Sequence, residues 1–347
     1  MARKRRLLRF VGFGCASIVL IVMGLAIWVA IQVREMTAPV VLTDYHPFRS
    51  QAEKERYLAY YDARAARWPV PSEARFVDTT WGATFVRISG PADGPPLVLL
   101  PGASATGLMF APNVASWAER FRVYAVDNVH DFGRSVYVRD LKSPDDYVDW
   151  LAQVLDGLGL DQRVNLLGLS YGGWVASQYG LRHPERLSRL VLVAPAATVA
   201  QFSLGFVKRG LLCIIPHPYF IKSMVRWSIA GATRGTPEQR RLAEEAAENA
   251  ALGLRCFRLR KTVDPTILSD EQWRSYQVPV LFLVGENEVI YEASARQAVA
   301  RLEQVAPEIE TEVFPDCGHD ISILQTERFN RRVARFLTPD DELKTPE

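Results

Sequence analysis

The stretch "LLGLSYGGW", residues 166–174, changes within a few positions from an apolar run to a serine that lies between glycines. Residues 164–169 have the pattern of a buried strand and residues 171–181 that of a helix, so Ser170 is expected at a strand-to-helix turn. A serine in that turn adopts a strained backbone conformation, which Gly168 and Gly172 permit because they lack β-carbons. Its hydroxyl is then exposed above the N-terminus of the next helix, where developing negative charge is stabilised. The stretch predicts a nucleophile, although G-x-S-x-G also occurs in ordinary glycine-rich turns.

Strand-like and helical segments alternate along the chain on both sides of this turn. The first two strand-like runs can form an antiparallel hairpin, and the later runs are continuously apolar, which is typical of strands covered by helices on both faces. The pattern predicts an α/β fold with a mostly parallel, eight-stranded sheet flanked by helices. The predicted strands are 75–78, 84–88, 97–100, 122–126, 164–169, 190–193, 280–284 and 310–314.

An uncharged run, residues 10–31, follows a cluster of basic residues near the N-terminus. As a helix it would measure about 33 Å, which is enough to cross a bilayer core. A cleaved signal peptide is the alternative, but it normally has a shorter apolar region followed by small residues at a cleavage site. Basic residues before the run outnumber those after it, so the positive-inside rule predicts a single-pass cell-membrane protein. Its N-terminus would be cytoplasmic and its catalytic domain extracytoplasmic.

Residues 194–279, between the sixth and seventh predicted strands, are too many for a bare loop. Their apolar residues, interrupted by prolines, predict several short helices that form a cap over Ser170. The predicted divisions are a basic cytoplasmic tail (1–9), a transmembrane signal-anchor helix (10–31), a tether with an N-terminal helix (32–70), the first part of the core (71–200), a helical cap (201–275), the second part of the core (276–338) and a polar tail (339–347).

Composition is that of an ordinary globular protein with a sizeable core. The 347 residues are 48% hydrophobic and 23% charged, with a formal net charge of +2, and nothing in this balance indicates nucleic-acid binding. Four cysteines are too few for a disulfide scaffold, and pairing of Cys213 with Cys256 is left open. No His/Cys cluster has metal-ligand spacing, so we expect neither a metal nor a cofactor.

Five motifs in a fixed order make the chain resemble the α/β-hydrolase-fold enzymes from about residue 76 to residue 337. They are "LLPGASAT", "AVDNVHDFGRS", "GLSYGG", "LVGENEV" and "DCGHD", and each lies at the end of a predicted strand. The resemblance implies a serine esterase-like member with a catalytic triad that forms an acyl-enzyme. Ser170 distinguishes the chain from haloalkane dehalogenases and epoxide hydrolases of this fold, which use an aspartate at that position.

A serine nucleophile needs a base within hydrogen-bond reach and an acid that orients the base. His319, in "DCGHD", follows both other candidates in the chain order that this fold requires. "GENEV" offers Glu286 and Glu288, and Glu288 occupies the position of the aspartate found in relatives. Asp320 is expected to cap the final helix. The remaining histidines are predicted to be structural: His46, His130, His183 and His217.

The resemblance also implies that the backbone N–H groups of Ala103 and Tyr171 form the oxyanion hole. Many relatives carry His-Gly where this chain has Pro101 and Gly102, so the hydrogen bonds of that histidine are missing or replaced. Ser104 can add a hydroxyl donor or stabilise the turn.

Hydrolysis of carboxylic esters with hydrophobic groups is the predicted reaction, because the cap is rich in apolar residues. A thioesterase, lactonase or carbon–carbon hydrolase with the same triad is an alternative. A ligand- or partner-binding module with an idle triad is a second alternative, since a fold does not dictate a function. The predicted partners are a small ester and, through the N-terminal helix, the lipid bilayer.

Overall fold

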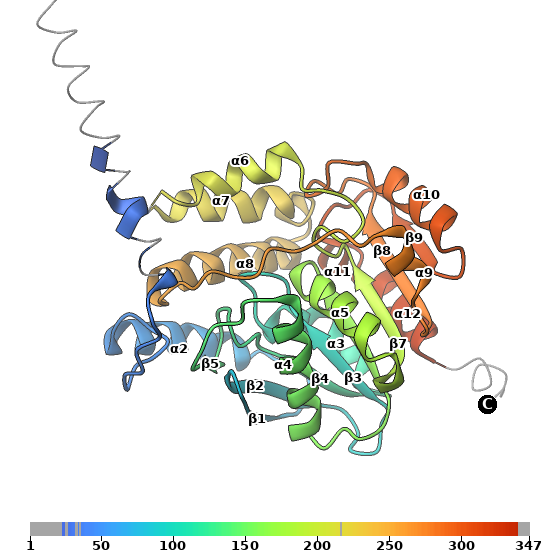
Figure 1. Cartoon of the computed structure of the whole chain (residues 1–347), viewed down its shortest axis with the longest axis horizontal. Helices are drawn as coiled ribbons and strands as arrows, with labels where there is room; N and C mark the ends of the chain where they lie inside the picture. The colour runs from blue at the N-terminus through green and yellow to red at the C-terminus, as the bar shows by residue number, and fades with distance from the viewer. Residues whose placement is uncertain (1–22, 25–26, 32–33, 35, 216, 339–347) are drawn as a thin grey trace, which may run out of the picture.

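The computed structural model describes residues 23–338 apart from 25, 26, 32, 33, 35 and 216. In this part of the chain a twisted sheet has helices on both faces, and α6, α7 and α8 form a further layer above it (Figure 1). The predicted membrane span, residues 10–31, falls largely outside the described residues. Among those that are described, no helix is both long enough and apolar enough to cross a membrane.

The sheet confirms the predicted fold class. Its strands follow the order β1-β2-β4-β3-β6-β7-β8-β9, in which β2 is antiparallel to β1 and β4 and every later pair is parallel. The short strand β5 also pairs with β2, and a strand of two residues shows no alternation from which to predict it. The strands are β1 (Ser72–Thr79), β2 (Gly82–Ser89), β3 (Pro96–Leu100), β4 (Arg122–Val126), β5 (Val136–Tyr137), β6 (Val164–Leu169), β7 (Leu187–Val193), β8 (Val280–Gly285) and β9 (Glu310–Phe314).

The two faces of the sheet carry separate apolar cores. In β3, Leu97 and Leu99 pack in the core that contains Trp117 of α3, whereas Val98 packs in the core that contains Trp174 of α5. All three leucine and valine side chains are fully buried, and burial of each stabilises the fold by about 1.5–3 kcal/mol. This packing explains why the strand is apolar at every position: alternate side chains enter different cores, so both faces must be apolar.

Helices follow most of the parallel strands and place loops at the carboxyl ends of those strands. The α-helices are α2 (Gln51–Ala65), α3 (Ala111–Trp117), α4 (Pro144–Gly157), α5 (Tyr171–Arg182), α6 (Leu204–Leu212), α7 (Pro218–Ser228), α8 (Pro237–Cys256), α9 (Asp270–Arg274), α10 (Ala295–Val305), α11 (Ile321–Leu324) and α12 (Thr326–Leu337). Three short 3₁₀ helices are η1 (Gly107–Phe110), η2 (Pro184–Arg186) and η3 (Ala232–Arg234).

Helix α2 packs against the rest of the protein through aromatic side chains. Ser50 caps the helix by accepting the N–H of Glu53 at 3.3 Å. Tyr57 and Tyr61 have exposed fractions of 0% and 1%, and the Tyr57 ring lies edge-on to Phe257, with ring centres 4.7 Å apart. The N-terminal helix is therefore part of the folded core.

The described cysteines Cys213, Cys256 and Cys317 are free thiols, so the pairing of Cys213 with Cys256 is not formed. The Cys213 thiol donates to the carbonyl oxygen of Arg209 at 3.2 Å, and the Cys256 thiol donates to Glu53 Oε2 at 3.0 Å. The two thiols therefore have separate polar partners, one on α6 and the other on α2.

Candidate active site

Ser170 lies in a strained turn between β6 and α5. Its backbone has φ 53° and ψ −116°, a conformation that costs about 1–3 kcal/mol for a non-glycine residue. A β-carbon on Gly168 would lie 2.2 Å from the Gly172 carbonyl oxygen, and one on Gly172 would lie 2.3 Å from the Leu100 carbonyl oxygen. Both glycines are therefore required for the turn to close, and the strand-to-helix turn predicted at Ser170 is present.

A cavity of about 220 Å³ opens beside this turn, and both Ser170 and His319 line it. Its floor comes from the loop after β3 and its roof from cap helices α6, α7 and α8. The wall is largely apolar, and its larger apolar side chains are Leu108, Met109, Leu169, Phe206, Ile221, Met224, Val225, Ile229, Leu242, Ile290 and Ile323.

His319 and Glu288 form a buried hydrogen-bonded pair next to the cavity. The Nδ1 atom of His319 lies 2.9 Å from Glu288 Oε2, and the side chains have exposed fractions of 11% and 0%. Because the carboxylate accepts a hydrogen bond, we assign the proton to Nδ1. The opposite ring nitrogen, Nε2, then carries the lone pair that a general base requires.

The second carboxylate oxygen of Glu288 is held by the backbone. Glu288 Oε1 accepts the N–H groups of Val289 at 2.8 Å and Ile290 at 3.0 Å. These two hydrogen bonds fix the longer side chain in one orientation, which offsets the extra rotational freedom of glutamate relative to aspartate. The geometry explains how a glutamate reaches His319 from this position.

Two opposing effects act on the pKa of His319. Burial disfavours the charged imidazolium, but the negative charge of Glu288 and its hydrogen bond favour it more. The pKa of His319 is therefore raised above its ordinary value, which suits a group that accepts a proton and then stabilises the resulting charge.

The other nearby carboxylates have different partners. Glu286 lies at the surface, where its Oε1 accepts from Arg296 Nη2 at 2.6 Å. The capping role expected for Asp320 is wrong, because its side chain makes no cap hydrogen bond to α11. Instead its two oxygens accept the N–H groups of Gly318 at 2.9 Å and Ala232 at 2.7 Å. Asp320 therefore joins the His319 loop to η3 of the cap.

The four remaining histidines make hydrogen bonds elsewhere and do not line the cavity. Burial lowers the pKa of His130 to about 4, so this side chain is neutral near pH 7. Their contacts are His46 Nε2 to the Tyr137 carbonyl at 2.5 Å, His130 Nε2 to the Arg139 carbonyl at 3.1 Å, His183 Nδ1 with Glu185 Oε1 at 3.0 Å, and His217 Nδ1 accepting the Tyr219 N–H at 3.2 Å.

Residues 102–106, which we call the oxyanion loop, line the cavity next to Ser170. A β-carbon on Gly102 would lie 3.3 Å from the Ser170 β-carbon, so the loop runs close to the elbow. Tyr171 is the first residue of α5, and N–H groups in the first turn of a helix have no acceptor within the helix. The backbone N–H groups of Ala103 and Tyr171, predicted to form the oxyanion hole, are thus placed on the two segments that flank Ser170.

Three further residues lie near this loop, and nothing in the sequence pattern identifies them as part of the site. Asp131 Oδ2 accepts the Ser104 N–H at 2.8 Å, and Asn249 Nδ2 of α8 donates to the Ser104 carbonyl at 2.8 Å. Arg64 of α2 lines the cavity, and 10% of its side chain is exposed. Asp131 and Asn249 hold the loop in a chain that lacks the histidine found in many relatives.

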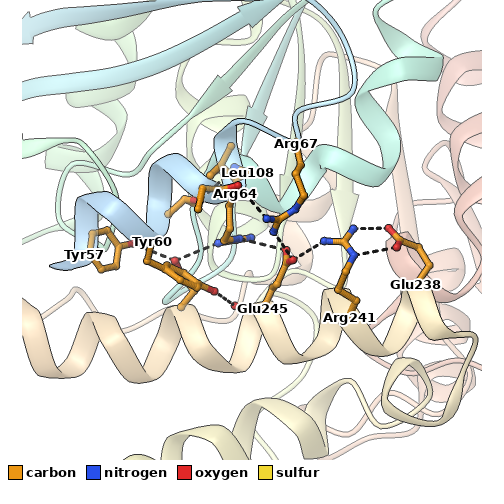
Figure 2. A network of polar contacts seen from close by, with 11 residues as sticks. Tyr57, Tyr60, Arg64, Arg67, Leu108, Glu238, Arg241 and Glu245 are labelled. Atoms are coloured by element: carbon orange, nitrogen blue, oxygen red, sulfur yellow. Dashed lines mark hydrogen bonds and ion pairs between the residues drawn. The ribbon is translucent and has the colours of Figure 1, made fainter. Parts of the chain in front are cut away.

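Charged side chains join α2 to α8 behind this part of the cavity. Figure 2 shows Arg64 of α2 and Arg67, which lies just after that helix, together with Arg241 of α8, around the carboxylate of Glu245. The distances from Glu245 are 3.4 Å to Arg64 Nε and 2.5 Å to Arg67 Nη2. The N-terminal helix and the cap are therefore connected beside the cavity that contains Ser170.

Together these groups can carry out acyl transfer: a strained serine, a histidine oriented by a carboxylate, and backbone N–H donors around an apolar cavity. Within the described ranges, no group of three or more His, Cys, Asp or Glu side chains is arranged to hold a metal ion.

Comparison with known proteins gives a consistent result. Residues 97–335 match the family described as Alpha/beta hydrolase family. The chain is 32% identical to carboxylesterase YbfK of Bacillus subtilis, and the match covers 86% of this chain and 98% of the relative. It is also 32% identical to the uncharacterized carboxylesterase nap of the same organism, over 82% of this chain and 93% of the relative. The crystal structure of naproxen esterase from Bacillus subtilis is also similar, with a TM-score of 0.75 and 31% sequence identity. The superposition covers 86% of this chain and 100% of the esterase chain.

Proposed function

Because this chain belongs to the alpha/beta hydrolase family and is a serine hydrolase of that fold, we propose that it is a membrane-anchored carboxylesterase that cleaves esters with hydrophobic groups. The pair formed by Glu288 and His319, on the same cavity as the strained Ser170, is the observation that carries this proposal. The two Bacillus subtilis relatives, which match 82% and 86% of this chain, are named as carboxylesterases, and this favours esters over the thioester, lactone and carbon–carbon alternatives.

Catalysis begins when Ser170 Oγ attacks the ester carbonyl and His319 Nε2 accepts the hydroxyl proton. The backbone N–H groups of Ala103 and Tyr171 stabilise the oxyanion of the tetrahedral intermediate. His319 then transfers its proton to the leaving alcohol, and the acyl group remains on Ser170. A water molecule, deprotonated by His319, attacks the acyl-enzyme and releases the carboxylic acid. Glu288 stays ionised throughout and stabilises the imidazolium.

The apolar cavity wall leads us to expect that activity increases with the length of the acyl chain. Each methylene group buried in the cavity contributes about 0.8 kcal/mol, which corresponds to about fourfold in kcat/KM, until the cavity is filled. The measurement is kcat/KM for a series of p-nitrophenyl esters from acetate to laurate. Values that are flat, or that fall from acetate onward, would contradict binding of the acyl chain in this cavity.

Thioesters and lactones of the preferred acyl length belong in the same series, because the triad alone does not distinguish them. A higher kcat/KM for one of these than for the matched oxygen ester would move the assignment to that alternative. The Ser170→Ala variant supplies the background rate for every substrate.

Membrane attachment by residues 10–31 is the second part of the proposal. The support is the uncharged run itself and the excess of basic residues on its N-terminal side. We expect protease added to intact cells to digest the catalytic domain, since this domain would lie outside the membrane. Protection in intact cells together with digestion in permeabilised cells would contradict the orientation, and a shortened soluble form would indicate cleavage instead.

A further inference from the structure

The oxyanion loop contains a second strained residue, directly after the proposed oxyanion donor. Ser104 has φ 60°, in the left-handed region that non-glycine residues rarely adopt. Such a conformation persists only where surrounding groups hold it. The Ala103 N–H belongs to the peptide group before the one that joins Ala103 to Ser104, so a fixed Ser104 backbone limits the rotation of Ala103 and of its N–H.

Two side chains hold Ser104, one at each of the peptide groups that flank it. Asp131 Oδ2 accepts the Ser104 N–H at 2.8 Å, and Asn249 Nδ2 donates to the Ser104 carbonyl at 2.8 Å. Asp131 belongs to the loop after β4, whereas Asn249 belongs to cap helix α8 and has an exposed fraction of 2%. The core and the cap therefore each provide one hydrogen bond to the same strained residue.

The orientation of the Asn249 amide is fixed from α2. Its Oδ1 atom accepts the Tyr57 hydroxyl at 3.1 Å and Arg64 Nη1 at 3.2 Å. With two donors on the oxygen, the amide nitrogen must face the Ser104 carbonyl. Tyr57 and Arg64 precede residue 97, where the family match begins, so this support is contributed by a helix outside the matched region.

We propose that Asn249 is a positioning residue for the oxyanion hole. Held by Tyr57 and Arg64, its amide fixes the Ser104 carbonyl and so keeps the Ala103 N–H directed at the oxyanion that forms on Ser170. This inference rests on the proposed function, in which Ala103 is an oxyanion donor. Loss of a whole donor costs about 10²–10³ in kcat, and loss of its support costs less.

Asn249→Asp is the sharpest test, because it changes one contact and keeps the shape. The carboxylate still accepts from Tyr57 and Arg64, but an oxygen replaces the N–H₂ that donates to Ser104. We expect kcat to fall by about 10–100-fold with KM changed by less than about threefold, since the loss concerns the transition state. Affinity for a trifluoromethyl ketone, which forms an oxyanion on Ser170, should fall by a similar factor.

Glu244→Gln is the matched control on the same helix. It weakens the ion pairs of Glu244 with Lys222 and Arg226 of α7. It leaves the residues that hold Ser104 untouched, so kcat and ketone affinity should stay within about twofold. Unchanged kcat and ketone affinity in Asn249→Asp would overturn the proposal. So would an equal loss of kcat in Glu244→Gln, because general loosening of the cap would then explain both.

Tyr57→Phe tests the same support if Asn249→Asp does not fold. It removes the hydroxyl that orients the amide and keeps the ring against Phe257. We expect a fall in kcat of about 3–10-fold at constant KM, whereas an unchanged kcat would count against the proposal. If the unaltered enzyme hydrolyses no ester, the proposed function fails, but the rate at which a fluorophosphonate labels Ser170 in each variant still measures the role of Asn249.

Discussion

Ser170→Ala is expected to lower kcat for ester hydrolysis by at least about 10⁴-fold, because the variant lacks the hydroxyl on which the acyl-enzyme forms. Binding should be retained, since the cavity wall is unchanged. Alanine occupies the same backbone conformation as serine, so the free energy of unfolding should change by less than about 1 kcal/mol. The measurements are kcat and KM for the preferred p-nitrophenyl ester, together with labelling by a fluorophosphonate.

Ser228→Ala provides the matched control, because Ser228 also lines the cavity but donates its hydroxyl to the Val225 carbonyl at 2.8 Å. It should keep both turnover and labelling. Labelling that persists in Ser170→Ala and disappears in Ser228→Ala would place the nucleophile on α7. A folded, unaltered enzyme that takes no label would favour the binding-module alternative.

Glu288→Gln is expected to lower kcat by about 10³–10⁴-fold while the protein folds normally. The amide oxygen of the new side chain can accept the N–H groups of Val289 and Ile290, which leaves the amide N–H₂ facing His319 Nδ1. The imidazole must then accept at Nδ1 and carry its proton on Nε2. In that tautomer it cannot take a proton from Ser170. Steady-state kinetics on a variant of confirmed stability provides the measurement.

Glu286→Gln distinguishes the two carboxylates of "GENEV". Glu286 pairs with Arg296 at the surface, and such pairs contribute little, so kcat should stay within about twofold. Reversed phenotypes in equally stable proteins would move the orienting acid to Glu286.

The pH dependence of kcat/KM gives an independent measurement on the same variant. Protonated His319 cannot act as the base, so activity falls as the pH is lowered through its pKa, which Glu288 raises above the ordinary 6.5. Loss of the Glu288 charge in Glu288→Gln lowers this pKa. The acidic limb of the residual activity should therefore move to lower pH, and an unmoved limb would contradict the role of Glu288.

The sheet and the elbow could be predicted from sequence because local rules determine them. Buried parallel strands require continuous apolar runs, and the turn at Ser170 requires residues without β-carbons at Gly168 and Gly172. Glu288 could be proposed from its position after the seventh predicted strand. The two backbone N–H groups that hold its longer side chain are visible only in the structure.

Contacts between the cap and the core could not be predicted in the same way. Asn249 and Ser104 are 145 residues apart, and their contact results from how two surfaces pack, which leaves no periodic pattern in the chain. Asp320 illustrates the same limit: its position suits a helix cap, yet its carboxylate binds Ala232 on the cap instead. Side chains with several available partners are assigned by tertiary packing rather than by local sequence.

The position of α2 also decides where a shortened form of this enzyme can begin. The family match starts at residue 97 and the first strand at Ser72, so a truncation designed on either boundary would discard α2. It would remove Arg64 from the cavity wall and expose the apolar surface on which Tyr57 and Tyr61 rest. A shortened enzyme that keeps α2 must therefore start before Ser50. Because Arg64 of α2 lines the cavity, libraries of variants intended to alter substrate preference should include α2 together with the cap.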